Sequence, residues 1–357
     1  MPTATHTMLA AVLYGKEDLR VEQTPVPGPA TGEIVVRVRA ALTCGTDLKV
    51  YRRGYHAKML KPPIPFGHEL AGEVASVGVG VTRFRVGDRV VALNSAPCGA
   101  CDFCRWGQEN LCDDLLFNNG AYAEYIRIPA RIVEKNTLTV PDALALEYAA
   151  MTEPLACVLH GIDETGIYHG QQIAVIGAGP IGLMFIHLAH KMGAEVIAVV
   201  RRAAQAETAR RFGAKHTVEA APNMEAADVI AAVRAHTPMQ RGADAVIEAV
   251  ATPQTWQWAV EMVRKGGAVN FFGGCAAGTT VELDTNRLHY NNLALHASFH
   301  HRPSVCRRAL DWIASGELDC AGFLTARKPL AEIVPVFAEM MNRSGDAAAN
   351  IKTVVVP

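Results

Sequence analysis

Four cysteines within one short segment carry the clearest chemical signal in this chain. They follow the spacing C-x2-C-x2-C-x7-C with tight-turn residues between them, and they are Cys98, Cys101, Cys104 and Cys112. Four thiolates that converge from such turns fit a tetrahedral zinc ion whose ligands all come from the protein. The alternatives are a disulfide knot or a chance clustering. We predict a structural zinc site in the lobe at residues 98–112, with no position left for a substrate.

A glycine-rich turn at residues 177–182 is the second signal. Its sequence G-A-G-P-I-G fits G-x-G-x-x-G, follows an apolar run at 172–176 and opens a helical stretch at 180–192. The first glycine permits the tight turn, the second lets the backbone approach a pyrophosphate, and the third lets helix and strand pack closely. The helix N-terminus then offers unpaired N–H groups to the phosphates. The alternative is a glycine-rich turn that binds nothing. The predicted dinucleotide-binding residues are Gly177, Gly179, Pro180, Ile181 and Gly182.

Two arginines bear on the choice of nicotinamide cofactor. Proteins that bind NAD usually place an acidic residue at the end of the next strand, where it accepts the ribose hydroxyls. This chain has Arg201 and Arg202 there. Guanidinium groups can hold a 2′-phosphate by charged, bidentate hydrogen bonds. We therefore predict NADP(H), with the alternative that both arginines are solvated and a backbone or neutral group holds NAD(H).

Three further segments hold residues that could form a second, reactive metal site. They are Cys44-Gly45-Thr46-Asp47, Gly67-His68-Glu69 and Glu153-Pro154. One thiolate, one imidazole and one or two carboxylates suit an open zinc site with a position left for a substrate oxygen. Taken singly, a cysteine is usually a buried apolar residue and a histidine a satisfied polar one. Because the segments are distant in sequence, their spacing alone does not join them into one site.

Two kinds of sequence pattern predict the structural elements that position these residues. The first third of the chain has short stretches rich in β-branched residues with glycines at their ends, at 33–40, 72–78 and 85–92, which predict a barrel-like β body. The cysteine lobe is an insertion in this body, and residues 122–128 predict a further strand. After a helical stretch at 143–165, strands alternate with helices, which predicts a parallel sheet with crossover helices.

These patterns predict an α/β protein of about two domains, as the length of 357 residues also suggests. We place a β-rich catalytic domain at residues 1–154 and a doubly wound, parallel-sheet cofactor domain at residues 155–295. Residues 296–357 contain two amphipathic helices and a short closing strand, and we expect them to return to the first domain.

Bulk composition excludes several classes of partner. The formal net charge is −1, so the chain lacks the excess of positive charge that is typical of proteins that bind nucleic acid or an anionic membrane. The N-terminus lacks a charged region followed by an apolar one, and the apolar stretch at 173–189 is broken by glycines and a proline. We therefore expect no signal peptide, no membrane span and a cytoplasmic protein with a small-molecule partner. In such a reducing compartment the nine cysteines favour metal ligands and free thiols over disulfides.

Taken in order, these segments resemble the zinc-dependent medium-chain dehydrogenases of the alcohol dehydrogenase family. The run Gly67-His68-Glu69-Leu70-Ala71-Gly72, with Gly78 further on, is similar to that family's signature, and Cys44, the lobe and the glycine turn fall in its order. The segments at Cys44 and Glu153 resemble the polyol (sorbitol) and threonine dehydrogenase branch. The resemblance covers essentially the whole chain. It implies a GroES-like fold for the catalytic domain and a Rossmann fold for the cofactor domain.

The resemblance also implies a catalytic zinc ion. Cys44 and His68 would bind it, while Glu69 and Glu153 compete for the remaining protein position, since members of this branch differ and some let water replace one carboxylate. With the lobe, the resemblance implies two zinc ions per chain.

Two residues near Cys44 would support the chemistry. By resemblance, Asp47 would hold the His68 imidazole, and Thr46 would bond the substrate hydroxyl and pass its proton outward. The alternatives are a solvated turn aspartate and a hydroxyl that only stabilises the turn. Lys49 stands where the family often has a relay histidine, so the outer end of the proton path stays open.

We therefore expect a zinc-dependent oxidoreductase that transfers a hydride between a secondary alcohol or polyol and a nicotinamide cofactor, working as a homotetramer or homodimer. The alternatives are a threonine-type amino-alcohol dehydrogenase that uses NAD(H), a catalytically silent zinc- and nucleotide-binding protein, and a zinc-free reductase of the same superfamily. The last two predict loss of metal ligands that this chain keeps. Weaker candidates for the substrate pocket, more simply explained as satisfied or surface residues, are His296, His300, His301, Tyr51, Arg53 and His56.

Overall fold

The computed structural model describes residues 6–56, 58–342 and 350–357 and divides into two compact units. The first contains Met1–Ala156 and His301–Pro357, and the second contains Cys157–His300. One unit is rich in antiparallel strands and the other alternates strands with helices, so the predicted α/β class with two kinds of domain is confirmed. The sequence-based boundaries after residues 154 and 295 stay predictions.

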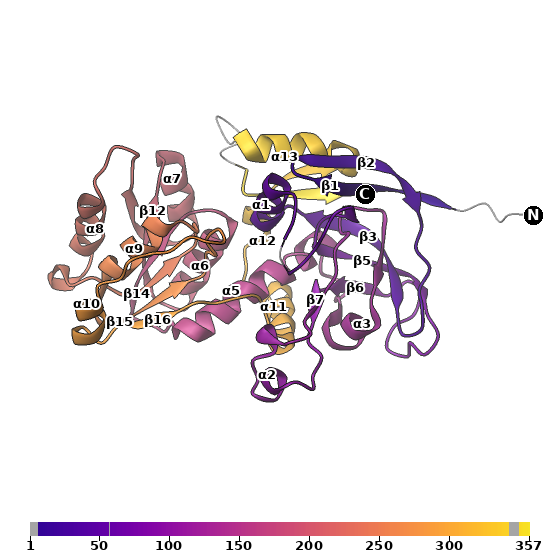
Figure 1. The fold of residues 1–357 in the computed structure, drawn as a ribbon, viewed down its shortest axis with the longest axis horizontal. Coiled ribbons are helices and arrows are strands. Elements are labelled where there is room, and N and C mark those ends of the chain that lie inside the picture. The colour runs from indigo at the N-terminus through magenta and orange to yellow at the C-terminus, as the bar shows by residue number, and fades with distance from the viewer. Residues whose placement is uncertain (1–5, 57, 343–349) are drawn as a thin grey trace, which may run out of the picture. The chain divides into compact units, whose positions relative to one another are not determined.

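The first unit is built on a seven-stranded sheet. Its order is β10-β6-β5-β3-β18-β17, and β9 also pairs with β3. The strands are β3 (Ile34–Leu42), β5 (Glu69–Val77), β6 (Arg89–Ala92), β9 (Tyr125–Ile128), β10 (Thr137–Thr139), β17 (Leu324–Pro329) and β18 (Lys352–Val356). Figure 1 shows the yellow C-terminal segment among the indigo N-terminal strands, because β18 pairs antiparallel with β3.

A smaller sheet and several helices complete this unit. The sheet has the order β2-β1-β4, with β1 (Thr7–Gly15), β2 (Asp18–Pro25) and β4 (Ile64–Pro65). The helices are α1 (Gly45–Arg53), α3 (Ala130–Asn136), α4 (Leu146–Ala149), α11 (Pro303–Ala314), α12 (Cys320–Phe323) and α13 (Ile333–Asn342). The cysteine lobe, with α2 (Asp102–Arg105) and the 3-10 turn η1 (Glu109–Leu111), lies between the paired strands β7 (Ser95–Ala96) and β8 (Leu116–Phe117).

Three aromatic rings form the core behind the reactive segments. Phe66, Tyr122 and Phe337 are fully buried, and their ring centroids lie 5.7–6.1 Å apart in tilted and edge-on arrangements. Gly67 adopts a φ of 88°, and a Cβ at this position would lie 2.7 Å from the Tyr122 ring. Only glycine fits such a left-handed, crowded position, so the aromatic core fixes where the chain turns into His68.

Three predicted elements differ in extent from the structure. The strand predicted over 122–128 is only β9, Tyr125–Ile128. The strand predicted over 85–92 begins only at Arg89, because the Asp88 carboxylate accepts from the Arg85 N–H and closes a turn. The helical stretch predicted over 143–165 is two helices, α4 and α5 (Thr152–Thr165). Pro154 explains the break, since proline lacks an N–H and fits the first turn of a helix but not its interior.

The second unit is a six-stranded parallel sheet with crossover helices (Figure 1). Its order is β13-β12-β11-β14-β15-β16, formed by β11 (Gln172–Ile176), β12 (Glu195–Val200), β13 (Ala214–Glu219), β14 (Ala243–Glu248), β15 (Val263–Phe271) and β16 (Ala294–His296). The helices are α6 (Pro180–Lys191), α7 (Ala203–Arg211), α8 (Ala226–Ala235), α9 (Pro253–Met262) and α10 (Thr285–Tyr290). From β11 the strands are added toward one edge of the sheet as far as β13, and from β14 toward the other edge. Ligands of such sheets bind at the carboxyl ends of the strands beside this switch in strand order.

No helix in the described part of the chain is long and apolar enough to span a bilayer.

Candidate functional site

The structure brings three of the predicted metal ligands together. One ligand atom each of Cys44, His68 and Glu69 lies within 4.8 Å of the other two. Cys44 is the N-cap of α1, and its Sγ accepts from the Thr46 N–H at 3.4 Å. His68 and Glu69 follow the constrained Gly67 at the start of β5. Thiolate, imidazole and carboxylate form a donor set that zinc binds in open sites, so these residues fit the predicted ion.

His68 is oriented by a buried hydrogen-bond chain. Its Nδ1 lies 2.8 Å from Oδ1 of Asp47, and the Tyr122 hydroxyl donates to Oδ2 of Asp47 at 2.6 Å. Burial alone would lower the pKa of His68, but the negative charges of Asp47 and Cys44 raise it well above its usual value. A proton on Nδ1 leaves Nε2 for a metal ion, the arrangement that carboxylates commonly enforce on ligand histidines.

Glu69 has a cationic partner that we did not predict from the sequence. Lys352 Nζ lies 2.9 Å from Oε1 and 2.7 Å from Oε2 of Glu69, and both residues are buried. Burial raises the pKa of Glu69, and the Lys352 charge opposes that shift. The available signal was a single lysine at the start of a closing strand that ends in three valines, because an unpaired charge is not tolerated in such an apolar strand. Lys352 therefore competes with zinc for the Glu69 carboxylate, and so bears on whether Glu69 or Glu153 is the third protein ligand.

Glu153 stands in the first turn of α5 and is 6% exposed. Burial raises the pKa of its carboxyl group to about 7, while the charge of His68 lowers it and that of Glu69 raises it. Glu153 therefore lies within electrostatic range of the Cys44, His68 and Glu69 cluster. Among the residues that the structure describes, it is outside the group whose ligand atoms all lie within 4.8 Å.

The histidine next to Glu153 is a satisfied core residue. His301 is 2% exposed, and its ring nitrogens lie 3.1 Å from Oδ1 of Asn94 and 3.2 Å from Sγ of Cys306. Its Nε2 is also 3.9 Å from Oε1 of Glu153. These contacts agree with the packing interpretation of His301 rather than with a place on the substrate surface.

The other weak candidates are either packed against neighbours or exposed to solvent. Tyr51 packs against Phe337 at 5.3 Å, and Nδ1 of His56 accepts from the N–H groups of Lys58 and Met59 at 3.1 Å. Arg53 is exposed in the last turn of α1. His296 is exposed on β16, and His300 has a φ of 63°.

The four lobe cysteines have the geometry of a tetrahedral thiolate site. Their Sγ atoms all lie within 4.8 Å of one another, and three of the separations are 3.5, 3.8 and 3.9 Å. A zinc ion with Zn–S bonds of about 2.3 Å gives tetrahedral edges of about 3.8 Å. All nine cysteines lie in the described part of the chain and are free, so the structure contains no disulfide knot. The lobe fits the predicted structural zinc.

Backbone donors and an arginine support the lobe. The N–H groups of Ala100 and Cys101 donate to Sγ of Cys98 at 3.3 Å and lower the pKa of this thiol to about 6, which favours the thiolate that zinc requires. Arg302, the N-cap of α11, donates to the Gly107 carbonyl oxygen at 2.9 Å. The lobe is therefore tied to the C-terminal segment of the same unit.

The glycine turn has the shape that a dinucleotide requires. Gly177 has a φ of 104°, and a Cβ on Gly182 would lie 1.9 Å from the Gly177 carbonyl oxygen, so both positions need glycine. A Cβ on Gly179 would meet no heavy atom of the described residues within 4 Å. Gly179 is the N-cap of α6, with Pro180 and Ile181 in its first turn. The space beside Gly179 and the N–H groups of α6 fit a pyrophosphate.

Arg201 and Arg202 follow the carboxyl end of β12, the strand next to β11. Arg201 is exposed, and its backbone N–H donates to the Gln205 side chain at 3.2 Å. Arg202 is the N-cap of α7. Both arginines therefore lie at the edge of the sheet where the glycine turn lies, and Arg201 is open to a ligand.

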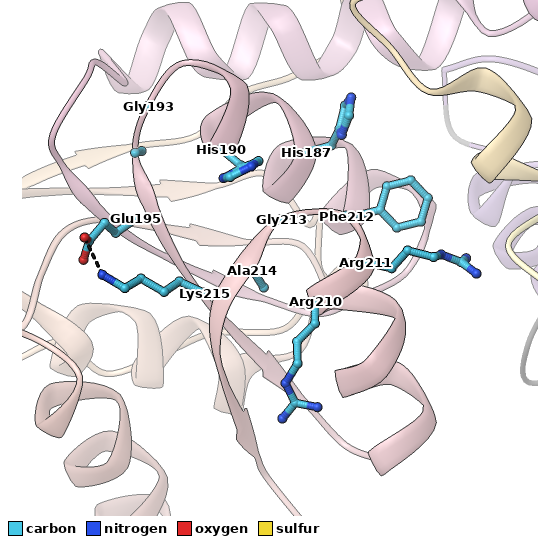
Figure 2. Close-up of a pocket in the computed structure, with 11 residues that line it drawn as sticks. His187, His190, Gly193, Glu195, Arg210, Arg211, Phe212, Gly213, Ala214 and Lys215 are labelled. Atoms are coloured by element: carbon cyan, nitrogen blue, oxygen red, sulfur yellow. Dashed lines mark hydrogen bonds and ion pairs between the residues drawn. The ribbon is translucent and has the colours of Figure 1, made fainter.

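A hollow of about 650 Å³ lies elsewhere in this unit. Figure 2 shows it among His187, His190, Arg211 and Lys215, with the ion pair between Lys215 and Glu195. These residues come from the ends of α6 and α7 and the starts of β12 and β13. The hollow is therefore at the amino ends of the strands, opposite the edge that carries the glycine turn, and it is not the dinucleotide site.

Comparison with known proteins shows the family to which the chain is similar and the solved structures that share its fold. Residues 30–142 match a family model described as the alcohol dehydrogenase GroES-like domain, and residues 180–315 match one described as zinc-binding dehydrogenase. The chain is 31% identical over 337 residues to sorbitol dehydrogenase of Bacillus subtilis, covering 92% of each chain. It is 34% identical over 266 residues to L-threonine 3-dehydrogenase of Caldanaerobacter subterraneus, covering 73% of this chain and 74% of that one.

Among solved structures, a zinc-binding dehydrogenase of Sinorhizobium meliloti bound to NADP is similar, with a TM-score of 0.87 and 31% identity. The match covers 99% of this chain and 100% of the other.

Proposed function

Because this chain belongs to the zinc-dependent alcohol and polyol dehydrogenase family and is therefore an oxidoreductase, we propose that it transfers a hydride between a secondary alcohol or polyol and NADP(H). The observation that carries the proposal is the cluster of half-buried Cys44 with buried His68 and Glu69, in which His68 is oriented by Asp47. A catalytically silent protein would have no need to keep this set of ionisable residues in its core.

We assign the catalytic zinc to Cys44 and His68, with Glu69 or Glu153 as the third protein ligand. Bound there, zinc would act as a Lewis acid on the substrate oxygen. The closeness of Glu69 to Cys44 and His68 supports Glu69, whereas the Lys352 ion pair competes for the same carboxylate. Burial raises the pKa of Glu153 to about 7 while the charges of His68 and Lys352 lower it, so Lys352 lies within electrostatic range of both candidate carboxylates.

The residues around the cluster fix protons and orientation. Asp47 keeps the proton on Nδ1 of His68, and Tyr122 in turn fixes Asp47. Thr46 lies in the same helical turn as Asp47, two residues after Cys44, and we assign its hydroxyl to receive the proton of the substrate alcohol. Phe66, Gly67 and the aromatic core exclude water behind the cluster.

We propose NADP(H) as the preferred cofactor. Gly177, Gly179 and Gly182 would seat its pyrophosphate, and Arg201, with Arg202, would bind its 2′-phosphate by charged hydrogen bonds. The absence of a carboxylate at residues 201 and 202 supports this choice, as does the NADP in the similar Sinorhizobium meliloti protein.

The substrate class is tested by measuring kcat/KM for sugar alcohols, simple secondary alcohols and L-threonine, each with NADP+ and NAD+. We expect turnover of a polyol or secondary alcohol with NADP+ preferred, and Arg201→Asp shifts the preference toward NAD+. L-Threonine is included because of the similarity to L-threonine 3-dehydrogenase. Preferred turnover of L-threonine with NAD+ would replace the proposal by the amino-alcohol alternative, and no turnover of any substrate would refute it.

Two predictions about the whole protein accompany this function. We propose a homotetramer or homodimer located in the cytoplasm, acting on a small molecule and on neither nucleic acid nor membrane. Sedimentation of the purified protein and fractionation of the source cells test these statements.

A further inference from the structure

A buried carboxylate lies next to the glycine turn, and none of the roles assigned above uses it. Glu248 ends β14 and is fully buried. Its Oε1 accepts from the N–H of Val250 at 2.8 Å, from the N–H of Ala251 at 2.9 Å and from the Thr255 hydroxyl at 2.8 Å. Two of these donors belong to the loop that follows Glu248, so the side chain holds its own loop in one conformation.

This loop, residues 249–252, lies against the glycine turn. Ile176 and Glu248 are partners in the parallel ladder, and the Ala249 N–H donates to the Ile176 carbonyl oxygen at 3.0 Å. A Cβ on Gly177 would lie 2.8 Å from Cγ2 of Val250 and 3.4 Å from the Ala249 oxygen. Val250 is 41% exposed, so an apolar side chain stands open to solvent at the first glycine of the turn.

The loop keeps a backbone conformation that needs a constraint. Ala251 has a φ of 76°, a region that residues with a Cβ rarely occupy and that is retained where the surroundings impose it. Gly273 confines the loop from the segment that follows β15. Its N–H donates to the Glu248 carbonyl oxygen at 2.8 Å, and a Cβ there would lie 2.5 Å from Oε2 of Glu248 and 2.6 Å from the Ala251 nitrogen.

We propose that Glu248 is a positioning residue for the dinucleotide. By accepting the N–H groups of Val250 and Ala251, it fixes residues 249–252 and keeps Val250 as one wall of the space beside the glycine turn. The inference rests on the proposed dinucleotide site at residues 177–182. It assigns Glu248 a role through the loop and not through contact with the ligand.

The test measures Kd for NADPH and NADH by titration calorimetry on the full-length protein and its variants. Glu248→Ala removes the acceptor, and we expect it to weaken the preferred dinucleotide by about 10- to 100-fold, because two backbone donors are left unsatisfied and the wall is released. Glu248→Gln keeps an amide oxygen that accepts both N–H groups, so we expect Kd within about threefold of the wild type. Amide exchange at Val250 and Ala251 should accelerate in Glu248→Ala and not in Glu248→Gln.

Two further variants separate this role from simple stability. Thr237 is buried, and its hydroxyl accepts from the Gly242 N–H at 3.0 Å, just before the opposite end of β14. Thr237→Val therefore removes a comparable loop contact in the same unit, and we expect a lower Tm with an unchanged Kd. Val250→Ala changes an exposed side chain, so the protein folds even if Glu248→Ala does not, and we expect Kd to rise by at least about threefold.

The outcomes are distinguishable. A Glu248→Ala protein with a lowered Tm but a Kd within twofold of the wild type overturns the inference, as does an equal loss in the Gln and Ala variants. Unchanged affinity in Val250→Ala also overturns it. A wild-type protein that binds neither dinucleotide would remove the proposed function itself, whereas wild-type binding with unaffected variants removes only the role of Glu248.

Discussion

Lys352→Met is the substitution that most sharply probes the interior of the reactive cluster. Methionine keeps the length and the apolar stem of lysine but leaves the Glu69 carboxylate without its cation. The two N···O contacts are 2.7 and 2.9 Å, and the side chains of Lys352 and Glu69 are 2% and 0% exposed. Asp47 contributes a further negative charge that raises the pKa of Glu69. The substitution therefore leaves a buried carboxylate among other carboxylates.

The expected cost follows from burial. At 2.7 Å and an effective dielectric constant of about 20, the gross attraction is about 6 kcal/mol. The desolvation of both groups offsets much of this value, but removal of one partner leaves the other charge uncompensated, which typically costs about 3–5 kcal/mol. We expect this loss in the metal-stripped protein. Lys352→Met combined with Glu69→Gln should recover most of it, because no buried charge is then left alone.

The assay is native-state amide exchange of β18 and β3, which reports on the first unit without assuming that the whole chain unfolds in one step. Lys328→Met is the matched control, because Lys328 pairs with Glu332 at 3.2 Å with side chains 40% and 48% exposed. Such an exposed pair contributes about 0–1 kcal/mol. A Lys352→Met protein that loses no more stability than Lys328→Met would refute the reasoning, and so would a double variant no more stable than Lys352→Met.

Three other predictions concern the same unit. In the metal-stripped protein, burial raises the pKa of Glu153 to about 7 from its usual 4.5, so the folded state binds this proton more tightly than the unfolded state. The associated stability is complete below pH 4.5 and is lost as pH rises through 7. This contribution to the free energy of unfolding amounts to about 3 kcal/mol. Denaturant titrations at several pH values in that range should show a weaker dependence of the free energy of unfolding on pH for Glu153→Gln than for the wild type. The same pH dependence in both proteins would contradict the raised pKa of Glu153. Cys104→Ser should lower the zinc content from two ions to one per chain and open the lobe to proteases, and an unchanged metal content would exclude the lobe as a zinc site. Tyr122→Phe removes the donor to Oδ2 of Asp47 and should weaken zinc binding at the reactive site by about 10- to 100-fold in chelator competition, whereas full affinity would show that the Tyr122 contact does not support His68.

The sequence predicted the features that depend on local pattern. The glycine turn, the apolar strand before it and the helix after it follow from short-range spacing. The structure has β11 with the expected bounds and α6 ending one residue earlier than expected, at Lys191. The cluster of four cysteines is equally predictable from the sequence, because their convergence needs only tight turns within residues 98–112. The parallel sheet of the second unit followed from the alternation of strands and helices.

Contacts between distant segments were beyond sequence reasoning. Lys352 meets Glu69 only because β18 and β5 both pair with β3. The lysine in the closing strand signals that it has a partner, but the sequence near it does not indicate that this partner is Glu69. Two of the three donors to Glu248 belong to the backbone of its own loop, and backbone donors carry no signal in the choice of side chains. Asp47, by contrast, was expected beside His68 through the family resemblance, and their 2.8 Å contact places it there.

The central claim is that the cluster of Cys44, His68 and a carboxylate holds the zinc ion on which dehydrogenation depends. The direct measurement strips the metal with a chelator, then follows both alcohol-dependent reduction of NADP+ and the binding of NADPH before and after zinc is restored. We predict that stripping abolishes turnover, leaves dinucleotide binding intact and is reversed by zinc in the wild type but not in His68→Ala. Full turnover by the metal-stripped protein would contradict the account.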